Sequence, residues 1–176
     1  MSEHNREQCL FCRIADGKEA ATQLLYQDTS FVIFSDIRPA ADHHYLVVTK
    51  EHLKDAKQLT KEHKPMVQNM VDVGQKFLEE KGGDLDDSRL GFHWPPFHAI
   101  AHLHMHVISP ASRMKLMGRI IFRPGLWFIT FRSVIEWSVG ETKTETEMET
   151  ETETETRSDG ARPVAPTTKV ELKFGS

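Results

Sequence analysis

The alternation of apolar and polar positions predicts an α+β chain with one main helix. Met70, Val73 and Phe77 recur at helical intervals, so the stretch around them should present one apolar face to a core. Shorter apolar runs are rich in β-branched and aromatic residues, which is typical of strands. The expected architecture is an antiparallel meander sheet packed on that helix. Strands are expected at 20–26, 31–34, 45–49, 89–93, 102–109 and 126–131, a short helix at 51–57, and the main helix from 59 to about 81.

Three histidines alternate with apolar residues within one of these predicted strands. Successive side chains of a strand point to opposite faces, which places His102, His104 and His106 on one face. Leu103 and Met105 then point to the other face, where a core can cover them. On a helix, at about 100° per residue, the same spacing would scatter the three rings over roughly 400° of arc. The pattern therefore predicts a strand that holds three imidazoles together.

A row of three imidazoles admits three interpretations. Histidine can act near neutral pH as nucleophile, general acid, general base or metal ligand. The row can be a solvated strand face without chemistry. It can converge on a metal ion, although no Asp or Glu lies close by in the sequence to orient the rings. The third interpretation, which we favour, is covalent catalysis at a phosphate.

The motif and its surroundings resemble the histidine triad superfamily of nucleotide hydrolases and transferases. The superfamily signature alternates three histidines with apolar residues and ends in two apolar residues, as residues 102–108 do. Further segments match in the same order from about residue 8 to about residue 135. Residues 90–97 narrow the resemblance to adenosine 5′-monophosphoramidases of the Hint branch, which are similar to the DNA-adenylate hydrolase aprataxin. The other matching segments are Cys9–Ile14, Phe34–Pro39 and His44–Leu53.

The resemblance implies an α+β histidine triad fold and catalysis through a nucleotidyl-histidine intermediate. His104 would attack the α-phosphorus, and water would then release the nucleoside monophosphate. His106 would donate a hydrogen bond to a non-bridging phosphate oxygen. The main-chain carbonyl of His102 would accept from Nδ1–H of His104 and fix its ring. The implied nucleotide-binding residues are Asp36 at the ribose hydroxyls, Ile37, His104, Met105 and His106, with Phe11 and Phe34 beside the base or in the core.

Several positions depart from the pattern of the Hint branch. Ala99 stands where a serine usually contacts the phosphate or the leaving group, His98 stands where a small polar residue is usual, and Thr49 replaces a proline. Loss of the serine hydroxyl removes a hydrogen bond worth about 1 kcal/mol, so we expect reduced turnover. His93, which also occurs in the aprataxin-like subgroup, either compensates for this loss or is an ordinary loop histidine.

Cys9 and Cys12 have the spacing of metal ligands. In some relatives this pair binds zinc with the histidines that match His52 and His102, so the resemblance implies a structural Cys₂His₂ zinc site as one interpretation. The alternative is that both cysteines are small, buried apolar residues. No cofactor is expected to be required for catalysis. Two cysteines in this spacing do not form a disulfide framework, and we expect a reducing compartment, the cytosol or nucleus.

Charge is distributed unevenly along the chain. The 176 residues carry a formal net charge of −4, but residues 141–156 contain seven Glu and one Lys. The rest of the chain is therefore near neutral to slightly basic. The Thr-Glu alternation is self-repelling, low-complexity sequence that should be disordered. We expect a flexible N-terminus at 1–8, a histidine triad domain at 9–135, and a disordered tail at 136–176, with only a trace of a closing helix at 132–139.

Three functions stay open at this point. The resemblance favours hydrolysis of the P–N bond of adenosine 5′-monophosphoramidates, and of acyl-adenylates, to AMP. A second function is hydrolysis of adenylated DNA ends, but no C₂H₂ finger or basic stripe is recognised, so nucleic acid is not expected as a partner. A third is a non-catalytic nucleotide-binding scaffold. We recognise no leader and no membrane span in the sequence, and we expect no membrane partner. The resemblance to the Hint branch implies a homodimer that pairs through the long helix.

Overall fold

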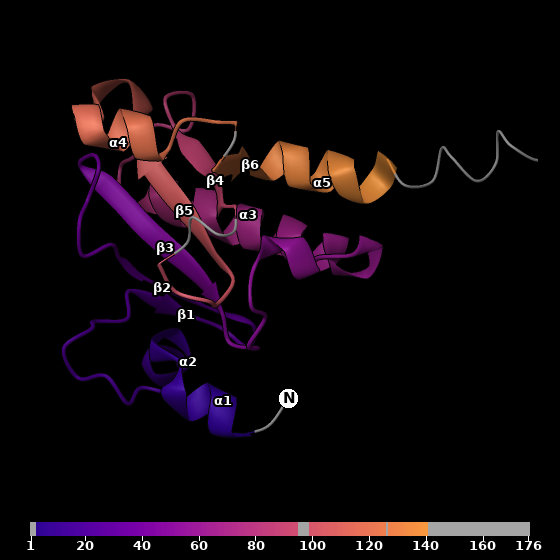
Figure 1. Ribbon diagram of the computed structural model, residues 1–176. Coiled ribbons are helices and arrows are strands. Elements are labelled where there is room, and N and C mark those ends of the chain that lie inside the picture. The colour runs from indigo at the N-terminus through magenta and orange to yellow at the C-terminus, as the bar shows by residue number, and fades with distance from the viewer. Residues whose placement is uncertain (1–2, 95–98, 126, 141–176) are drawn as a thin grey trace, which may run out of the picture. The chain divides into compact units, whose positions relative to one another are not determined.

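The computed structural model describes residues 3–94, 99–125 and 127–140, which form a sheet with helices on both faces (Figure 1). The expectations for His98 and the Thr-Glu run lie outside the described residues. The α+β prediction is confirmed. The helices are α1 Glu3–Gln8, α2 Leu10–Ala15, α3 Lys64–Glu80, α4 Leu116–Ile121 and α5 Phe131–Gly140. The strands are β1 Tyr26–Gln27, β2 Phe31–Ser35, β3 His43–Thr49, β4 Arg89–His93, β5 His104–Ser109 and β6 Phe128–Thr130. The 3₁₀ turns are η1 Ala56–Gln58, η2 Lys61–His63 and η3 Ala111–Arg113.

The six strands are antiparallel in the order β1-β2-β3-β5-β4-β6. The first three strands form a meander, and α3 then carries the chain over the sheet. As a result β5 lies between β3 and β4, and its pairing with β3 runs from His43 opposite Ser109 to Val48 opposite His104. The histidine motif therefore lies in the middle of the sheet, where neighbouring strands hold it on both sides.

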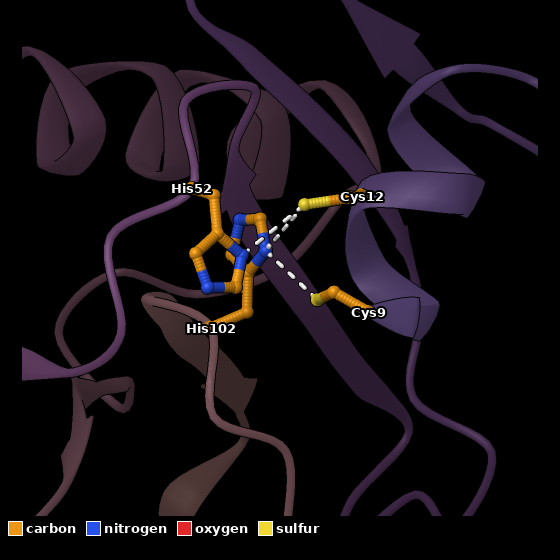
Figure 2. A group of neighbouring side chains, drawn as sticks. All are labelled: Cys9, Cys12, His52 and His102. Carbon is orange, nitrogen blue, oxygen red and sulfur yellow. Dashed lines mark hydrogen bonds between the residues drawn. The ribbon is translucent and has the colours of Figure 1, made fainter. Parts of the chain in front are cut away.

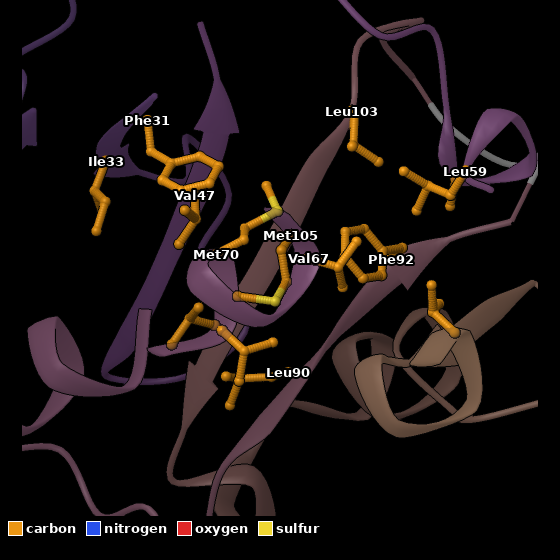
Figure 3. Packing of buried hydrophobic residues seen from close by; sticks show 14 of the residues in the cluster. Phe31, Ile33, Val47, Leu59, Val67, Met70, Leu90, Phe92, Leu103 and Met105 are labelled. Atoms are coloured by element: carbon orange, nitrogen blue, oxygen red, sulfur yellow. The ribbon is translucent and has the colours of Figure 1, made fainter. Parts of the chain in front are cut away.

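The two faces of the sheet pack against different helices. One face packs against α3, where Met105 and Val47 of the sheet meet Met70 of the helix (Figure 3). A Cβ at Gly74 of α3 would lie 3.0 Å from Cε of Met105, so a larger residue here would require the sheet side chains to shift away from the helix. The opposite face packs against α2 through Phe11. The apolar half of the histidine motif thus anchors β5 on α3 and leaves the imidazoles on the other face.

Three predicted strands begin later than expected, and one of them, predicted at 126–131, consists of Phe128–Thr130 because Phe131 begins helix α5. The first strand was predicted at 20–26, but it consists of Tyr26 and Gln27. The residues before it form a turn, in which the amide of Thr22 donates a hydrogen bond to the carbonyl oxygen of Glu19. The strand predicted from His102 begins at His104 instead. Each strand is limited by its partner: β1 pairs with β2 over two residues, and β5 pairs with β3 only as far as its first residue.

The helices also differ from expectation at four places. The main helix was expected from residue 59, but α3 begins at Lys64, after the separate turn η2. The segment 132–139 was expected to keep only a trace of a helix, yet α5 is ten residues long. Its Val134 is buried in the core that α3 covers, which supplies the apolar contact that stabilises it. Of the short helix predicted at 51–57, only Ala56 and Lys57 are helical, in the turn η1. Helix α1 lies within the segment expected to be flexible, and flexibility there stays a prediction, as do the domain boundaries.

Candidate active site and metal-ligand cluster

The histidine motif serves two neighbouring sites. His104 and His106 point to the same side of β5, with their ring centroids 5.1 Å apart. His102 precedes the strand, and its buried side chain turns towards the N-terminal helices. The expectation that all three histidines lie within one strand is therefore wrong, because His102 lies before β5. The rings of His102 and His104 both stand edge-on to Phe11 of α2, and His102 also belongs to a cluster with the cysteines.

The ring of His104 is fixed by the main chain of His102. Nδ1 of His104 lies 2.6 Å from the carbonyl oxygen of His102, which can only accept, so Nδ1 carries the proton. Nε2 then keeps its lone pair. Burial lowers the pKa of His104 to about 4, so the ring is neutral at neutral pH. A neutral imidazole with a free Nε2 has the form that a nucleophile requires.

A second chain of hydrogen bonds sets the proton of His106. The amide of Ala40 donates to Nδ1 of His44 over 3.1 Å, so neutral His44 carries its proton on Nε2. That proton points at Nδ1 of His106, 2.9 Å away. His106 must then carry its own proton on Nε2, which is buried and has no hydrogen-bond partner among the described residues. Such a donor is available to an acceptor on a bound ligand.

Asp36 lies beside this chain of histidines. Its Oδ2 is 3.5 Å from Nε2 of His44 and 3.8 Å from Nδ1 of His106, and its Oδ1 accepts from the amide of Arg38. Two imidazoles and a carboxylate at these distances resemble a metal site. However, the Ala40 amide occupies the lone pair of His44, and Nε2 of that ring is protonated. The arrangement therefore fits a hydrogen-bond network better than a metal site.

Cys9, Cys12, His52 and His102 form the second cluster (Figure 2). Nδ1 of His102 lies 3.3 Å from Sγ of Cys9 and 3.4 Å from Sγ of Cys12, and Nδ1 of His52 lies 3.2 Å from Sγ of Cys12. In tetrahedral zinc coordination a sulfur and a nitrogen ligand are about 3.6 Å apart. The four residues thus fit a tetrahedral metal after small side-chain shifts.

The proton on His102 also suits a metal ligand. Its Nε2 lies 2.7 Å from the carbonyl oxygen of Thr49, so Nε2–H donates there and the lone pair of Nδ1 faces the two sulfurs. The sequence offered no acid for this orienting role, and a main-chain carbonyl performs it. Burial raises the pKa of Cys12 to about 12 in the metal-free chain, so a metal would have to displace that proton.

Comparison with known proteins decides the family. Residues 8–122 match the family described as "Scavenger mRNA decapping enzyme C-term binding". The adenosine 5′-monophosphoramidase HINT3 of Xenopus tropicalis is 48% identical over 130 residues, which cover 73% of this chain and 85% of the relative. The chain belongs to the histidine triad superfamily. Within that superfamily it is similar to HINT3 proteins, which agrees with the branch that its motifs resemble.

Solved histidine triad structures share the fold. A histidine triad protein from Clostridium difficile has a TM-score of 0.55 and 28% identity, and the match covers 61% of this chain and 92% of that one. A zinc-bound histidine triad family protein from Mycobacterium smegmatis has a TM-score of 0.52 and 22% identity, covering 77% of this chain and 99% of that one. The sheet and helices described above are therefore those of the superfamily.

The implied nucleotide-binding residues do not all lie where a nucleotide can reach them. Ile37 is 94% exposed, and Asp36 lies at the edge of the histidine cluster. Met105 is fully buried on the α3 face of the sheet, so its side chain cannot contact a nucleotide and only its main chain can. Phe11 is buried and its ring stands edge-on to His104, at 5.1 Å between centroids. Phe34 packs beside Phe11 in the same buried cluster.

Three residues near the histidines had no assigned role in the sequence analysis. His44 was quoted only as part of a matching segment. Phe122 packs on His44 and His106, with centroid distances of 5.1 and 5.0 Å. Lys54 lines a small cleft together with His93 and His104. The strand pairing of β3 with β5 brings His44 into place, and no local sequence pattern indicates that pairing.

His93 is the last residue of β4, so its interpretation as an ordinary loop histidine is wrong. The centroid of the His93 ring lies 4.8 Å from that of His106 and 5.2 Å from that of Phe122. Ala99 is exposed.

Among the described residues, no helix has the length and apolar character needed to cross a membrane.

Proposed function

We propose that this chain hydrolyses adenosine 5′-monophosphoramidates, and acyl-adenylates, to AMP through a nucleotidyl-His104 intermediate. The similarity to HINT3 adenosine 5′-monophosphoramidases supports the reaction class. The observation that carries the proposal is the hydrogen bond from Nδ1–H of His104 to the carbonyl oxygen of His102, because it leaves Nε2 unprotonated and directed away from the main chain. Asp36 would accept from the ribose hydroxyls.

The chemistry divides into two displacements at phosphorus. Nε2 of His104 forms a bond to the α-phosphorus as the P–N bond breaks, and the leaving amine takes up a proton. Water then attacks the phosphorus and returns a proton to the group that protonated the amine, the bond to Nε2 breaks, and AMP leaves with His104 neutral again. His93 lines the cleft beside His104 and is placed to supply the proton that the amine requires. This would offset the serine hydroxyl that Ala99 lacks.

Charge develops on the non-bridging oxygens during both displacements. Nε2–H of His106 would donate to one of these oxygens, since it has no partner among the described residues. His44 would hold that proton in place through Nδ1 of His106. Lys54 lines the same cleft as His104 and would add a positive charge near the phosphate. Removal of one such donor typically slows a reaction by about 10²–10³-fold.

A single-turnover reaction tests the proposal directly. The chain should release AMP from adenosine 5′-phosphoramidate, and samples quenched rapidly in alkali, in which the P–N bond to histidine survives, should carry AMP on His104 when digested and sequenced. His104→Ala should lose turnover while it still binds AMP. Activity above a few per cent in His104→Ala would refute the covalent assignment. Cleavage of nicked, adenylated DNA at a higher rate than the phosphoramidate would favour the aprataxin-like function, and binding without turnover would favour a scaffold.

We also propose that Cys9, Cys12, His52 and His102 hold a structural zinc ion. The donor set, its separations and the orientation of His102 support this. Zinc would tie α2 to the loop before β5 and take no part in bond breaking. Metal analysis of the purified chain should give about one zinc per chain, and a well-folded chain without zinc would end this proposal.

A homodimer in the cytosol and nucleus is proposed from the resemblance to the Hint branch. Pairing would involve α3 and a neighbouring edge strand of the sheet, whose two edges in this chain are β1 and β6. A chain shortened to residue 140 keeps every described element and should keep its dimer and its activity. Light scattering of the shortened and full chains checks the dimer. A monomer after shortening would mean that the tail takes part in assembly.

A further inference from the structure

Helix α4 presents large apolar side chains to solvent. Four of its six residues are apolar and exposed, with Leu116 at 77% and Met117 at 66%. Side chains in a groove would be less exposed than this, so these protrude from the surface. Exposed apolar patches of this kind commonly mark a contact surface. We call this the α4 patch, and it consists of Leu116, Met117, Ile120 and Ile121.

Cations surround the α4 patch. Residues 113–123 contain four basic residues and no acid. Arg113 pairs with Asp42, whereas the guanidinium of Arg119 donates to the carbonyls of Met114 and Ser112. Lys115 and Arg123 are exposed, and among the described residues no carboxylate is ion-paired with either. The patch is therefore an apolar protrusion with a positively charged rim.

We propose that the α4 patch docks on an anionic lipid surface, with its apolar side chains in the interface and its cations at the headgroups. A lipid interface accepts protruding side chains without a preformed pocket, and anionic headgroups attract a basic rim. The proposal goes beyond the proposed hydrolysis and does not depend on it. It would revise the expectation of no membrane partner, and it requires no membrane-spanning helix.

Two other occupants fit the patch less well. A second copy of the chain would place the same cations against one another across a two-fold axis, which costs free energy. A nucleic acid would use the cations at its phosphates but would leave Leu116 and Met117 without apolar contacts. An anionic lipid surface provides apolar contacts for the protruding side chains and negatively charged headgroups for the cations of the rim.

The α4 patch is attached to the active site through Phe122. This residue follows α4, is buried, and packs on His44, His93 and His106. Gly118 on the inner side of α4 lies against Ala40, whose amide orients His44. Docking on α4 would therefore place the catalytic histidines close to the lipid surface.

Sedimentation with vesicles tests the proposal on the full chain. The chain should pellet with phosphatidylcholine vesicles that contain 30% phosphatidylserine, and should stay in solution with phosphatidylcholine alone. The double variant Leu116→Ser with Met117→Ser should bind about tenfold more weakly, because less apolar surface enters the interface. Arg123→Gln should bind about fivefold more weakly, and added salt should weaken the wild type.

Matched controls separate the patch from general effects. Leu10→Ser removes another partly exposed apolar side chain, and Lys61→Gln removes another exposed cation. Both should bind vesicles like the wild type. The α4 variants should keep their circular dichroism and their turnover in solution, because they touch no catalytic group.

Three outcomes would overturn the proposal. The first is no pelleting with anionic vesicles, or equal pelleting with phosphatidylcholine alone. The second is capture by a DNA duplex in place of vesicles. The third is that the wild type does not bind vesicles while the double variant changes its oligomeric state. That result would make the α4 patch a contact between copies of the chain.

Discussion

The carbonyl oxygen of His102 accepts a hydrogen bond from Nδ1 of His104 over 2.6 Å, while the imidazole of the same His102 faces the two cysteines. One residue thus connects the candidate metal cluster with the proposed nucleophile. Any movement of His102 that alters its main chain changes where Nε2 of His104 points. The two clusters should therefore not behave independently.

Loss of the metal cluster should impair catalysis at a distance from the phosphate. Cys9→Ser and Cys12→Ser should each reduce the zinc content and lower the melting temperature. Because His102 then loses its anchor, kcat should fall about tenfold with little change in KM. Metal analysis, thermal unfolding and steady-state kinetics measure the three effects. Chelation of the wild type and re-addition of zinc provide the control, and an unchanged kcat in a zinc-free variant would separate the two sites.

The orientation of His106 by His44 can be tested by a pair of substitutions. His44→Phe removes the donor to Nδ1 of His106 and should lower kcat by about 10²-fold, with little effect on AMP binding. His44→Gln retains an amide donor and should recover part of the loss. Partial rescue by Gln distinguishes positioning from simple packing. Equal activity of both variants would show that the hydrogen bond to His106 does not matter.

Asp36 should distinguish ribose from dideoxyribose. If its carboxylate accepts from the 2′ and 3′ hydroxyls, a 2′,3′-dideoxy substrate should bind the wild type more weakly by about 1.5–3 kcal/mol. Asp36→Ala should bind both substrates alike. Calorimetric titration with ribo and dideoxy nucleotides gives the difference. A variant that still discriminates like the wild type would place the ribose elsewhere.

Acid should destabilise the fold over a defined range of pH. Burial lowers the pKa of His44 to about 4, and that of His106 also lies well below its usual value of about 6.5. In the unfolded chain both histidines bind protons near pH 6.5, whereas in the folded chain His44 binds one only near pH 4 and His106 only well below pH 6.5. The free energy of unfolding should be greatest above pH 6.5 and should decrease as the pH falls from 6.5 towards 4, by up to about 1.4 kcal/mol per pH unit for each such histidine.

Urea unfolding at several pH values measures this dependence. His44→Gln should show a shallower slope between pH 6.5 and 4, because one neutral buried imidazole is gone. His63→Gln, which changes a partly exposed histidine at the start of α3, is the control. A stability that rises on acidification would contradict the sign of the argument.

The sequence by itself determined the local parts of this protein. The helical recurrence of apolar residues predicted the main helix, a strand was predicted at 89–93 with the observed bounds of β4, and the histidine motif indicated the chemistry. These features depend on periodicity over a few residues, which the covalent chain fixes directly. The motifs that resemble the histidine triad superfamily are also short and local, and the comparisons confirmed the family.

Only the tertiary structure decided which groups meet. His44 and His106 are 62 residues apart in sequence, and the antiparallel pairing of β3 with β5 brings their rings together. His102 looked equivalent to His104 in the alternation, but pairing with β3 ends at His104 and leaves His102 free to join the cysteines. The helix α5 forms because Val134 finds a buried surface. Such contacts depend on strand register and packing between distant segments, which periodicity along the chain does not encode.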